Sequence, residues 1–186
     1  VDFDDLLLPV QLLEEHEDVS LDLWRRWRYL MIDEYQDTNA VQFELARLLA
    51  GTRRNLCVVG DDDQSIYAFR GADVGNILEF ERHFPGARVV KLEENYRSTR
   101  RILAAANAVI AGNARRHPKT LRTSNPIGEP IDYYEHADEE AEAETIAKEI
   151  SVRRFRHGMK WVDFAILYRT NTQARPIEEP PRAQNV

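Results

Sequence analysis

Four clusters of polar and aromatic residues in this chain have types and spacings that suit chemistry. The first follows the apolar run 29–32 and reads Asp33-Glu34-Tyr35-Gln36-Asp37-Thr38. An aspartate at the end of a buried strand can help to hold Mg²⁺ on nucleotide phosphates, and the glutamate after it can orient or deprotonate an attacking water. An Asp-Glu pair also begins many solvated turns, so by itself it is weak support for a nucleotide hydrolase.

The second cluster spans residues 60–71 and combines acids, an amide, two aromatic rings and an arginine. Consecutive side chains on one segment diverge, so we expect Asp62 to lie in a solvated turn rather than in a metal site. Gln64 can both donate and accept hydrogen bonds, which suits the sensing of a phosphate or a water. Tyr67, Phe69 and Arg70 could stack on and grip a single nucleic-acid strand. The alternative is an aromatic pair buried under the sheet.

The third and fourth clusters lie in the second half of the chain. Tyr96 and Arg97 precede a predicted helix, where an arginine can reach a phosphate as a charge-stabilising finger and a tyrosine ring can stack on a base. The alternative is an ordinary helix start with Ser98 as its cap. The fourth cluster, Arg169-Thr170-Asn171, could touch a nucleic-acid backbone and is the least specific of the four.

The elements that must position these clusters alternate along the chain. Unbroken apolar runs at 29–32, 56–59, 89–92 and 164–167 predict strands buried on both faces, as in a parallel sheet. Helices are expected between them, and strands alternating with helices predict an α/β fold. In such sheets ligands bind beyond the carboxyl ends of the strands, where the four clusters lie.

Three helices are predicted from periodicity and end signals. Residues 39–50 carry one apolar stripe, with Asn39 and Gln42 as a capping pair and Gly51 as the stop. Residues 98–111 open at Ser98 or Thr99. Residues 138–156 begin with acids and finish with arginines, an order that matches the helix dipole and indicates a solvated surface helix.

Composition gives an ambiguous first impression of function. The net charge is −7, which argues against a nucleic-acid binder, but residues 1–90 carry nine basic and 18 acidic residues while residues 91–186 carry 16 and 14. We therefore expect two units, with Pro85-Gly86 as the candidate junction. A single cysteine favours a cytoplasmic location, and no apolar run approaches the length of a membrane span.

Taken together, the clusters resemble the motifs of UvrD/Rep-type superfamily 1 DNA helicases, and within that group their residues are most similar to those of Rep. Residues 33–38 are similar to the Walker B motif (motif II), residues 59–72 to motif III, residues 92–99 to motif IV and residues 167–171 to motif IVa. The resemblance implies a parallel-sheet P-loop NTPase (RecA-like) motor. Residues 1–90 would be the second part of the first RecA-like domain, and residues 91–186 the first part of the second.

The resemblance also implies roles for individual residues and for ligands. Asp33 would bind Mg²⁺, Glu34 would be the catalytic base and Gln64 would contact the γ-phosphate of ATP. Tyr96 would stack on adenine and Arg97 would be the arginine finger. Single-stranded DNA would meet the remaining candidates, Tyr67, Phe69, Arg70, Arg169 and Asn171. Phe69 departs from the tryptophan that is usual in the family, which weakens the stacking without removing it.

The expected activity is ATP-driven translocation on single strands and unwinding of forked duplex DNA, with replication or repair proteins as candidate protein partners and no membrane. No Gly-x-x-x-x-Gly-Lys-Ser/Thr sequence (Walker A) occurs in the 186 residues, so we expect a central fragment that is inactive alone. Two alternatives stay open. The first is a metal-dependent nuclease that uses Asp33, Glu34 and Asp61–Asp63, or a helicase–nuclease subunit that shares these motifs. The second is a catalytically inert interaction module derived from a helicase.

Overall fold

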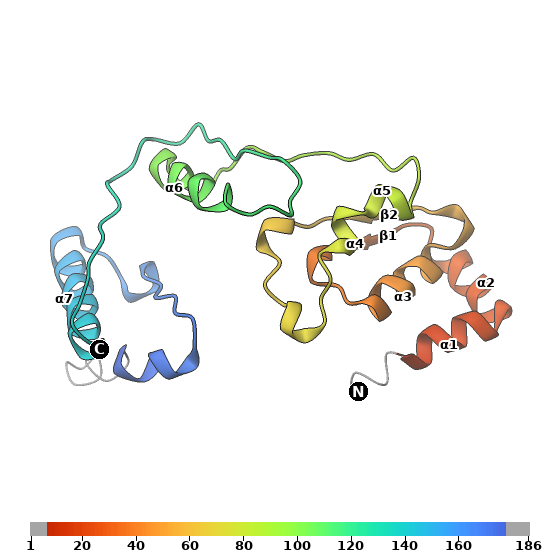
Figure 1. The fold of residues 1–186 in the computed structure, drawn as a ribbon, viewed down its shortest axis with the longest axis horizontal. Coiled ribbons are helices and arrows are strands. Elements are labelled where there is room, and N and C mark those ends of the chain that lie inside the picture. The colour runs from red at the N-terminus through yellow and green to blue at the C-terminus, as the bar shows by residue number, and fades with distance from the viewer. Residues whose placement is uncertain (1–6, 178–186) are drawn as a thin grey trace. The chain divides into compact units, whose positions relative to one another are not determined.

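The computed structural model describes residues 7–177, and these fall into two compact units that meet in sequence between Pro130 and Ile131 (Figure 1). The first unit contains the only β-sheet of the described residues together with α1 to α6. The second contains the long helix α7 and the segment after it. The predicted division into motor domains at residues 90 and 91 stays a prediction.

Three helices pack together at the start of the first unit. They are α1 (Leu7–Glu15), α2 (Glu17–Arg26) and α3 (Ala40–Ala50). The prediction of α3 is confirmed, including its capping box: the Asn39 side chain accepts from the backbone N–H of Gln42, and the Gln42 side chain accepts from the backbone N–H of Asn39. Periodicity had not identified α1 and α2, although acids in the first turn of α2 and arginines in its last turn fit the helix dipole.

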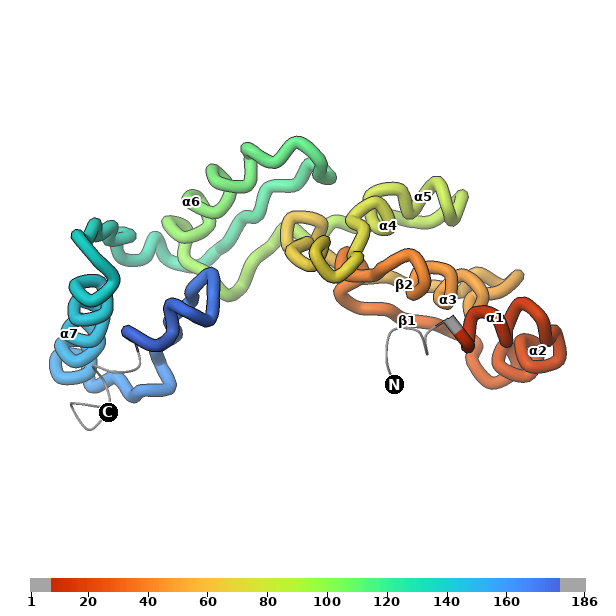
Figure 2. Tube along the Cα trace, turned by 60° about the horizontal axis from the view of Figure 1, so that its bottom comes forward, coloured from red at the N-terminus to blue at the C-terminus, as the bar shows by residue number. Residues whose placement is uncertain are grey.

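The sheet consists of two short parallel strands, β1 (Leu30–Ile32) and β2 (Leu56–Val58), which lie side by side in Figures 1 and 2. Helix α3 lies in the connection between them. The pairing continues beyond the strands, because the backbone N–H of Val59 donates to the carbonyl of Ile32 and that of Tyr35 donates to the carbonyl of Val59. The two strand ends that precede the first and second clusters therefore meet at one edge, as predicted.

The aromatic core beside this edge fixes the first cluster. Tyr35 is fully buried in the short 3₁₀ helix Tyr35–Asp37, and its ring meets Phe80 edge-on with the centroids 5.7 Å apart. Phe80 stacks in turn on Phe84 at 4.7 Å. These two phenylalanines begin and follow α5 (Phe80–His83), and the 3₁₀ helix also contacts α4 (Gly75–Leu78). Burial raises the pKa of the Tyr35 hydroxyl to about 12, so it stays protonated at neutral pH.

Two of the four predicted strands are wrong. Residues 89–92 and 164–167 are extended segments without a ladder among the described residues, and an isolated parallel bridge between Glu94 and Arg122 is the nearest approach to one. Val90 and Leu167 are 62% and 91% exposed, so these apolar runs are not buried between helices. A parallel strand needs a hydrogen-bonding neighbour, and the described residues supply none for either run.

Helix α6 (Arg100–Ile110) is confirmed within the range predicted for it, with Thr99 at its N-cap. The loop after it returns along the 90–96 segment, as Figure 2 shows. Asn107 fixes this return, because its side chain donates to the carbonyl of Leu121 at 2.8 Å and accepts from the backbone N–H of Leu121 at 3.2 Å. The loop thereby presents residues 115–119 to the rest of the first unit.

The second unit is organised by α7 (Glu139–His157), which confirms the prediction for residues 138–156. Asp138 caps it by accepting from the backbone N–H of Ala141, and Gly158 ends it in the left-handed conformation at φ 65°. The guanidinium carbon of Arg154 lies 3.5 Å from the ring centroid of Trp161, which fastens the following turn to the helix.

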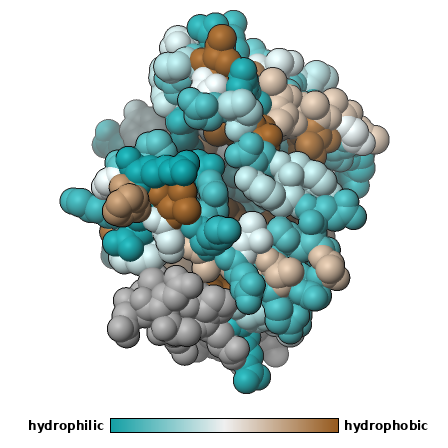
Figure 3. Space-filling view, turned by 90° about the vertical axis from the view of Figure 1, so that its left-hand side faces the viewer, coloured by the Kyte–Doolittle hydropathy of each residue, from teal (hydrophilic) through white to brown (hydrophobic). Residues whose placement is uncertain are grey.

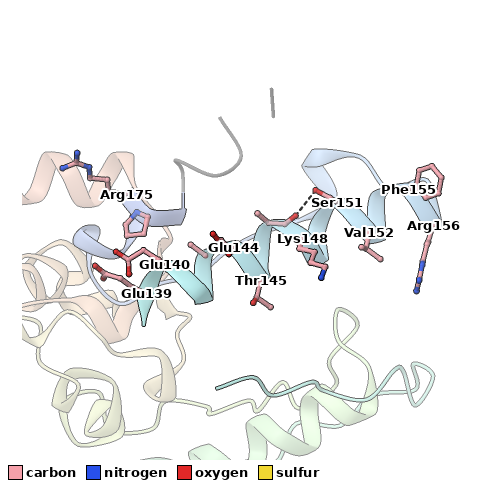
Figure 4. Close-up of a pocket in the computed structure, with 13 residues that line it drawn as sticks. Glu139, Glu140, Glu144, Thr145, Lys148, Ser151, Val152, Phe155, Arg156 and Arg175 are labelled. Carbon is pink, nitrogen blue, oxygen red and sulfur yellow. Dashed lines mark hydrogen bonds between the residues drawn. The ribbon is translucent and has the colours of Figure 1, made fainter. Parts of the chain in front are cut away.

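The face that Figure 3 shows is mainly hydrophilic, with separate apolar residues between the polar ones. A hollow runs along α7 and is lined by acidic, basic and apolar side chains of the helix together with Arg175 and Pro176 (Figure 4). It contains none of the predicted site residues. None of the helices within residues 7–177 has the length and apolar character needed to cross a membrane.

Candidate active site

The acidic pair of the first cluster lies at the carboxyl end of β1. Asp33 and Glu34 are both exposed, and the backbone N–H of Glu34 donates to Asp33 Oδ1 at 2.9 Å. Glu34 adopts the left-handed conformation, with φ 52° and ψ 41°, which is uncommon for a residue with a side chain. This turn redirects the chain from β1 into the 3₁₀ helix and leaves two carboxylates together at the strand end.

Gln36 joins the first cluster to the second. Its side chain is 1% exposed, and its amide nitrogen donates to Glu34 Oε2 at 2.8 Å. Its amide oxygen accepts from the backbone N–H of Asp61 at 3.0 Å. Gly60 allows this close approach, since a Cβ there would lie 2.5 Å from the Gln36 oxygen. Both ends of a buried amide are thus satisfied by the two loops that follow β1 and β2.

Asp61 passes the connection on to Gln64. The Gln64 amide nitrogen donates to Asp61 Oδ2 at 2.7 Å, and Asp61 Oδ1 accepts from the backbone N–H of Asp63 at 3.1 Å. Glu34, Gln36, Asp61 and Gln64 therefore form one chain of hydrogen bonds, which we call the polar link. It brings together two residues to which the sequence assigned different steps of one reaction.

The three aspartates of the second cluster are paired with the basic loop after α6, which corrects the expectation for Asp62. Asp62 is 6% exposed rather than solvated. The Lys119 ammonium lies 2.7 Å from Asp61 Oδ1, 2.6 Å from Asp62 Oδ1 and 3.0 Å from Asp63 Oδ2. We call Asp61, Asp62, Asp63, Arg116 and Lys119 the ion-pair cluster. Asp62 is buried because all three aspartates converge on the Lys119 ammonium, an arrangement that the local spacing of residues 61–63 does not reveal.

Arg116 and a backbone group complete the ion-pair cluster. Arg116 binds Asp63 with two parallel hydrogen bonds, at 2.8 Å from Nε and 2.7 Å from the terminal nitrogen. The backbone N–H of His117 donates to Asp62 Oδ2 at 2.7 Å. Three carboxylates thus face two cations and one amide, so each acidic group has a specific partner.

These contacts shift the ionisation of the cluster in opposite directions for acids and bases. Burial opposes ionisation of Asp61, but hydrogen bonds from Lys119 and Gln64 outweigh it and lower its pKa. The Arg116 hydrogen bonds lower the pKa of Asp63 despite partial burial. Burial alone would lower the pKa of Lys119, yet the three carboxylates raise it above its ordinary value. Asp61, Asp63, Arg116 and Lys119 are therefore all charged at neutral pH.

The aromatic residues of the second cluster lie together on the surface. The ring centroids of Tyr67 and Phe69 are 6.0 Å apart, and the Arg70 guanidinium lies 5.1 Å and 5.4 Å from them. Phe69 is 78% exposed, so the alternative of an aromatic pair buried under the sheet is wrong for this ring. Two flat rings and a cation form a surface of the type on which nucleic-acid bases stack.

Tyr96 and Arg97 are held by their backbone and not by their side chains. The side-chain oxygen of Asn95 accepts from the backbone N–H groups of Arg97 and Ser98, and Asn125 donates to the carbonyls of Tyr96 and Ser98. Tyr96 is 81% exposed and Arg97 is also exposed. Within residues 7–177 no hydrogen bond or ion pair joins Arg97 to Glu34 or Gln64.

Arg169 and Asn171 belong to the second unit and are exposed there. The side-chain oxygen of Gln173 accepts from the backbone N–H groups of Arg169 and Thr170 at 2.9 and 3.0 Å, which shapes the turn at Asn171–Gln173. The arrangement presents two polar side chains to solvent. Their predicted contact with DNA stays a prediction.

The residues at the end of β1 fit a magnesium ion bound together with phosphates. Mg²⁺ in nucleotide sites takes one or two protein carboxylates and completes its shell with phosphate oxygens and waters, and the exposed Asp33 supplies one such carboxylate. No group of three or more His, Cys, Asp or Glu side chains within the described residues is arranged as a metal site. The nuclease alternative needs the carboxylates of Asp61–Asp63, and those are engaged by Lys119 and Arg116.

Sequence reasoning missed Gln36, Arg116 and Lys119 as parts of this arrangement. Gln36 lies inside the first cluster but carried no role of its own. The two cations belong to the run Arg115-Arg116-His117-Pro118-Lys119, whose density of positive charge mirrors the three acids at 61–63. Charge complementarity between these two short runs was the available signal, although charge alone does not show that these two runs, among all charged segments, pair with each other.

Comparison with known proteins agrees with the motifs. Residues 1–85 match the family model described as the UvrD/REP helicase N-terminal domain, and residues 90–186 match the UvrD-like helicase C-terminal domain. A relative named ATP-dependent DNA helicase PcrA from Staphylococcus aureus (strain Mu50) is 51% identical over 180 residues, which cover 96% of this chain and 24% of the relative. The protein of the same name from Staphylococcus epidermidis (strain ATCC 35984) is 49% identical over 187 residues, covering 100% of this chain and 26% of the relative.

The chain thus spans about a quarter of the length of these curated relatives. The nearer likeness to Rep stays a prediction. Both family models cover the clusters from which the resemblance was drawn, one on each side of residues 86–89. By sequence and by motif, the chain belongs to the UvrD-like helicase family.

Proposed function

We propose that this chain is part of an ATP-dependent DNA helicase, in which it couples ATP hydrolysis to movement along single-stranded DNA. The observation that carries the proposal is the polar link, because it connects Glu34 at the end of β1 to Gln64 in the loop that also bears Phe69. A change at Glu34 or Gln64 would thereby reach the segment that exposes the aromatic rings.

The residues at the strand ends suit phosphoryl transfer from ATP to water. Asp33 would hold Mg²⁺ on the phosphates, and the bound ion would neutralise charge that develops on their oxygens. Glu34 would accept a proton from the attacking water, and Gln36 would hold the glutamate by donating to Oε2. Gln64 keeps a second amide hydrogen for a γ-phosphate oxygen while Asp61 fixes the first.

Two further residues would complete the nucleotide site. Tyr96 exposes a ring for stacking on adenine, and Arg97 carries a charge for the phosphates as an arginine finger. Both follow Glu94, whose bridge to Arg122 and whose neighbour Asn95 fix the local backbone. An exposed finger suits a helicase cycle, in which the arginine engages the phosphates only on closure.

Single-stranded DNA would contact Tyr67, Phe69 and Arg70, with Arg169 and Asn171 as further contacts. The exposure of Phe69 and the position of Arg70 over both rings support this part of the proposal. Forked duplex DNA would be the substrate for unwinding, and proteins of replication or repair would be the partners. We expect the cytoplasm as the compartment, where the exposed thiol of Cys57 stays reduced.

The proposal includes parts of two RecA-like domains. Residues 1–90 would belong to the first and residues 91–186 to the second, a division supported by the family models that end at residue 85 and begin at residue 90. The pair of parallel strands with helices is the type of structure that a RecA-like domain contains. For the 186-residue chain alone we expect no ATP turnover.

A Glu34→Gln variant tests the proposal in the whole protein, meaning the full-length polypeptide that carries this chain. The variant should bind ATP with affinity close to that of the unmodified protein, because the amide keeps the size and the position of the carboxylate. Its DNA-stimulated hydrolysis should fall by at least about 100-fold, since a general base contributes on that order. Single-turnover hydrolysis and equilibrium binding of a fluorescent ATP analogue measure the two quantities.

A Glu44→Gln variant is the matched control. Glu44 pairs with Arg47 on the surface of α3, away from the polar link, and its loss should leave hydrolysis unchanged. Normal turnover by the Glu34→Gln protein would contradict the assignment of the base, and an unmodified protein without DNA-stimulated hydrolysis would contradict the proposed function.

A further inference from the structure

The ion-pair cluster holds the loop at 61–64 in one arrangement. An ammonium group has three hydrogens, and Lys119 directs them at carboxylate oxygens of three consecutive aspartates at 2.6 to 3.0 Å. Arg116 grips the third aspartate bidentately and also donates to the carbonyl of Lys119 at 3.2 Å. The side chains of Arg116 and Lys119 are only 16% and 15% exposed, so solvent screens these pairs weakly.

The basic loop that carries these cations is itself held in place. Pro118, between His117 and Lys119, fixes one backbone dihedral, which reduces the conformational freedom that the loop must lose. The Lys91 ammonium donates to the carbonyl of Pro118 at 2.6 Å. The two side-chain hydrogen bonds between Asn107 and Leu121 anchor the loop to α6. Lys119 is therefore a rigid partner rather than a mobile surface lysine.

Asp61 connects the ion-pair cluster to the predicted reaction. One of its carboxylate oxygens accepts from Lys119 at 2.7 Å and the other accepts from Gln64 at 2.7 Å. The orientation of the Gln64 amide therefore depends on a carboxylate that is itself oriented by Lys119 and by the backbone N–H of Asp63. The two cations come from the segment matched by the C-terminal family model, whereas the aspartates and Gln64 come from the segment matched by the N-terminal one.

From this geometry we propose that Lys119 and Arg116 are positioning residues for Gln64, holding its amide in the orientation that acts on the γ-phosphate through the Asp61 carboxylate. The proposal rests on the proposed function and adds two residues from outside the helicase motifs. Without Lys119, three carboxylates would face each other with Arg116 as the one remaining cation of the cluster. Their repulsion would turn Asp61 away from Gln64, even though the fold around the strands persists.

A role in stability alone is the competing explanation, and a double-mutant cycle separates the two. If Lys119 acts through Gln64, then Lys119→Met should have little further effect on turnover once Gln64 is alanine. If Lys119 only stabilises the fold, the two losses should multiply. A positioning role also predicts a fall in kcat with the KM for ATP nearly unchanged, because Gln64 acts on the γ-phosphate during reaction.

The test uses the whole protein and measures DNA-stimulated ATP hydrolysis for the Lys119→Met, Gln64→Ala and doubly substituted forms. We expect Lys119→Met to lower kcat by at least about tenfold, as is typical for residues that orient a reacting group. Lys119→Arg should restore most of the loss, because an arginine keeps the charge and the reach. Lys148→Met, the same replacement on the exposed face of α7, is the control and should leave kcat unchanged.

Thermal unfolding of each variant shows whether it is folded. If Lys119→Met does not fold, Arg116→Lys keeps the charge but removes the bidentate contact with Asp63, and its kcat should fall in the same non-additive way. Multiplying losses, or an unchanged kcat in a folded Lys119→Met protein, would overturn the inference while leaving the proposed function intact. An unmodified protein that does not hydrolyse ATP with DNA would instead overturn the proposed function, and the inference with it.

Discussion

Gln36 shows how one neutral residue can decide the geometry of a charged site. Its amide is 1% exposed and binds Glu34 at one end and the backbone of Asp61 at the other. A buried amide that lost either partner would leave a polar group unsatisfied, at a cost of about 1–3 kcal/mol. The position of Glu34 is thus fixed by packing and hydrogen bonding behind it, and the carboxylate itself stays accessible.

The space that Gly60 leaves for Gln36 gives a prediction at the scale of one residue. In Gly60→Ala, the new Cβ would lie 2.5 Å from the Gln36 oxygen, 2.8 Å from the Ile77 methyl and 3.1 Å from the Tyr35 nitrogen. The backbone contact cannot move freely, so Gln36 must shift and its hydrogen bond to Asp61 must weaken. The free energy of unfolding of the first unit should fall by about 1–3 kcal/mol, measured by urea titration of the 186-residue chain.

Gly112→Ala provides the control for this substitution. Its new Cβ would come no closer than 3.5 Å to another atom, the carbonyl oxygen of Val109, which is ordinary van der Waals contact. Its urea midpoint should equal or slightly exceed that of the unmodified chain, because alanine restricts the unfolded chain more than glycine does. Equal stability of the two variants would show that the Gly60 position tolerates a side chain and that Gln36 is not confined by it.

At the scale of elements, the features that could be predicted from sequence are those set by local interactions. The capping box at Asn39 and Gln42 lies within four successive positions, and the charge order of residues 138–156 follows from the dipole of a single helix. The strands at 29–32 and 56–59 were also recognisable, because each apolar run finds the other as its neighbour. The two helix features need no knowledge of distant residues, whereas each strand needs the other as its partner.

The remaining elements depended on partners that the sequence pattern does not identify. The runs at 89–92 and 164–167 have the composition of strands, yet no described segment pairs with them and Leu92 is 79% exposed. The burial of Asp62 depends on Lys119, which is 57 positions away in the chain. Period and composition describe a segment, whereas burial and strand pairing are properties of two segments together.

The junction between the aspartate loop and the basic loop gives a prediction for the pH dependence of stability. The pKa values of Asp61 and Asp63 are lowered by folding, so their contribution is complete above the ordinary value of 3.8 and is lost as the pH falls through the lowered values. The pKa of Lys119 is raised by folding, so its contribution is complete below the ordinary value of 10.5 and is lost as the pH rises beyond it. Between these limits the cluster contributes a constant stabilisation.

The Lys119→Met substitution in the 186-residue chain should show the pH range over which the ion-pair cluster stabilises the fold. Removing one partner from a buried ion pair costs about 3 kcal/mol, and this difference from the unmodified chain should be constant from pH 5 to 9. It should shrink below pH 3.8, where the carboxylates gain protons in both proteins. Arg122→Met, which removes an exposed pair with Glu94, should cost little at any pH. Thermal unfolding of the unmodified chain and of both variants across this pH range measures their stabilities. A stability difference between Lys119→Met and the unmodified chain that stays constant down to pH 2 would contradict the assigned ion pairs.

At the scale of the whole molecule, the net charge of −7 has to be reconciled with a nucleic-acid ligand. Part of the acidity of residues 1–90 is offset locally, since Asp61, Asp62 and Asp63 are paired with Arg116 and Lys119. The surface proposed to contact DNA consists of Tyr67, Phe69 and Arg70, which would act by stacking and by a single charge. Affinity should therefore come from base stacking more than from counterion release.

The effect of salt on two substitutions tests this balance in the whole protein. Phe69→Ala should weaken binding to a single strand by about 1–3 kcal/mol, the contribution of one stacked base, while the slope of log affinity against log salt stays unchanged. Arg70→Ala should flatten that slope by about 0.7, the contribution of one phosphate contact on a single strand. Val162→Ala removes another side chain that is 86% exposed and should change neither quantity. Fluorescence anisotropy with a labelled oligonucleotide at several salt concentrations measures both.

Because Phe69 is 78% exposed, its loss should not alter the melting temperature, so weaker binding would reflect the lost ring itself. Unchanged affinity in Phe69→Ala would show that DNA does not stack on this surface.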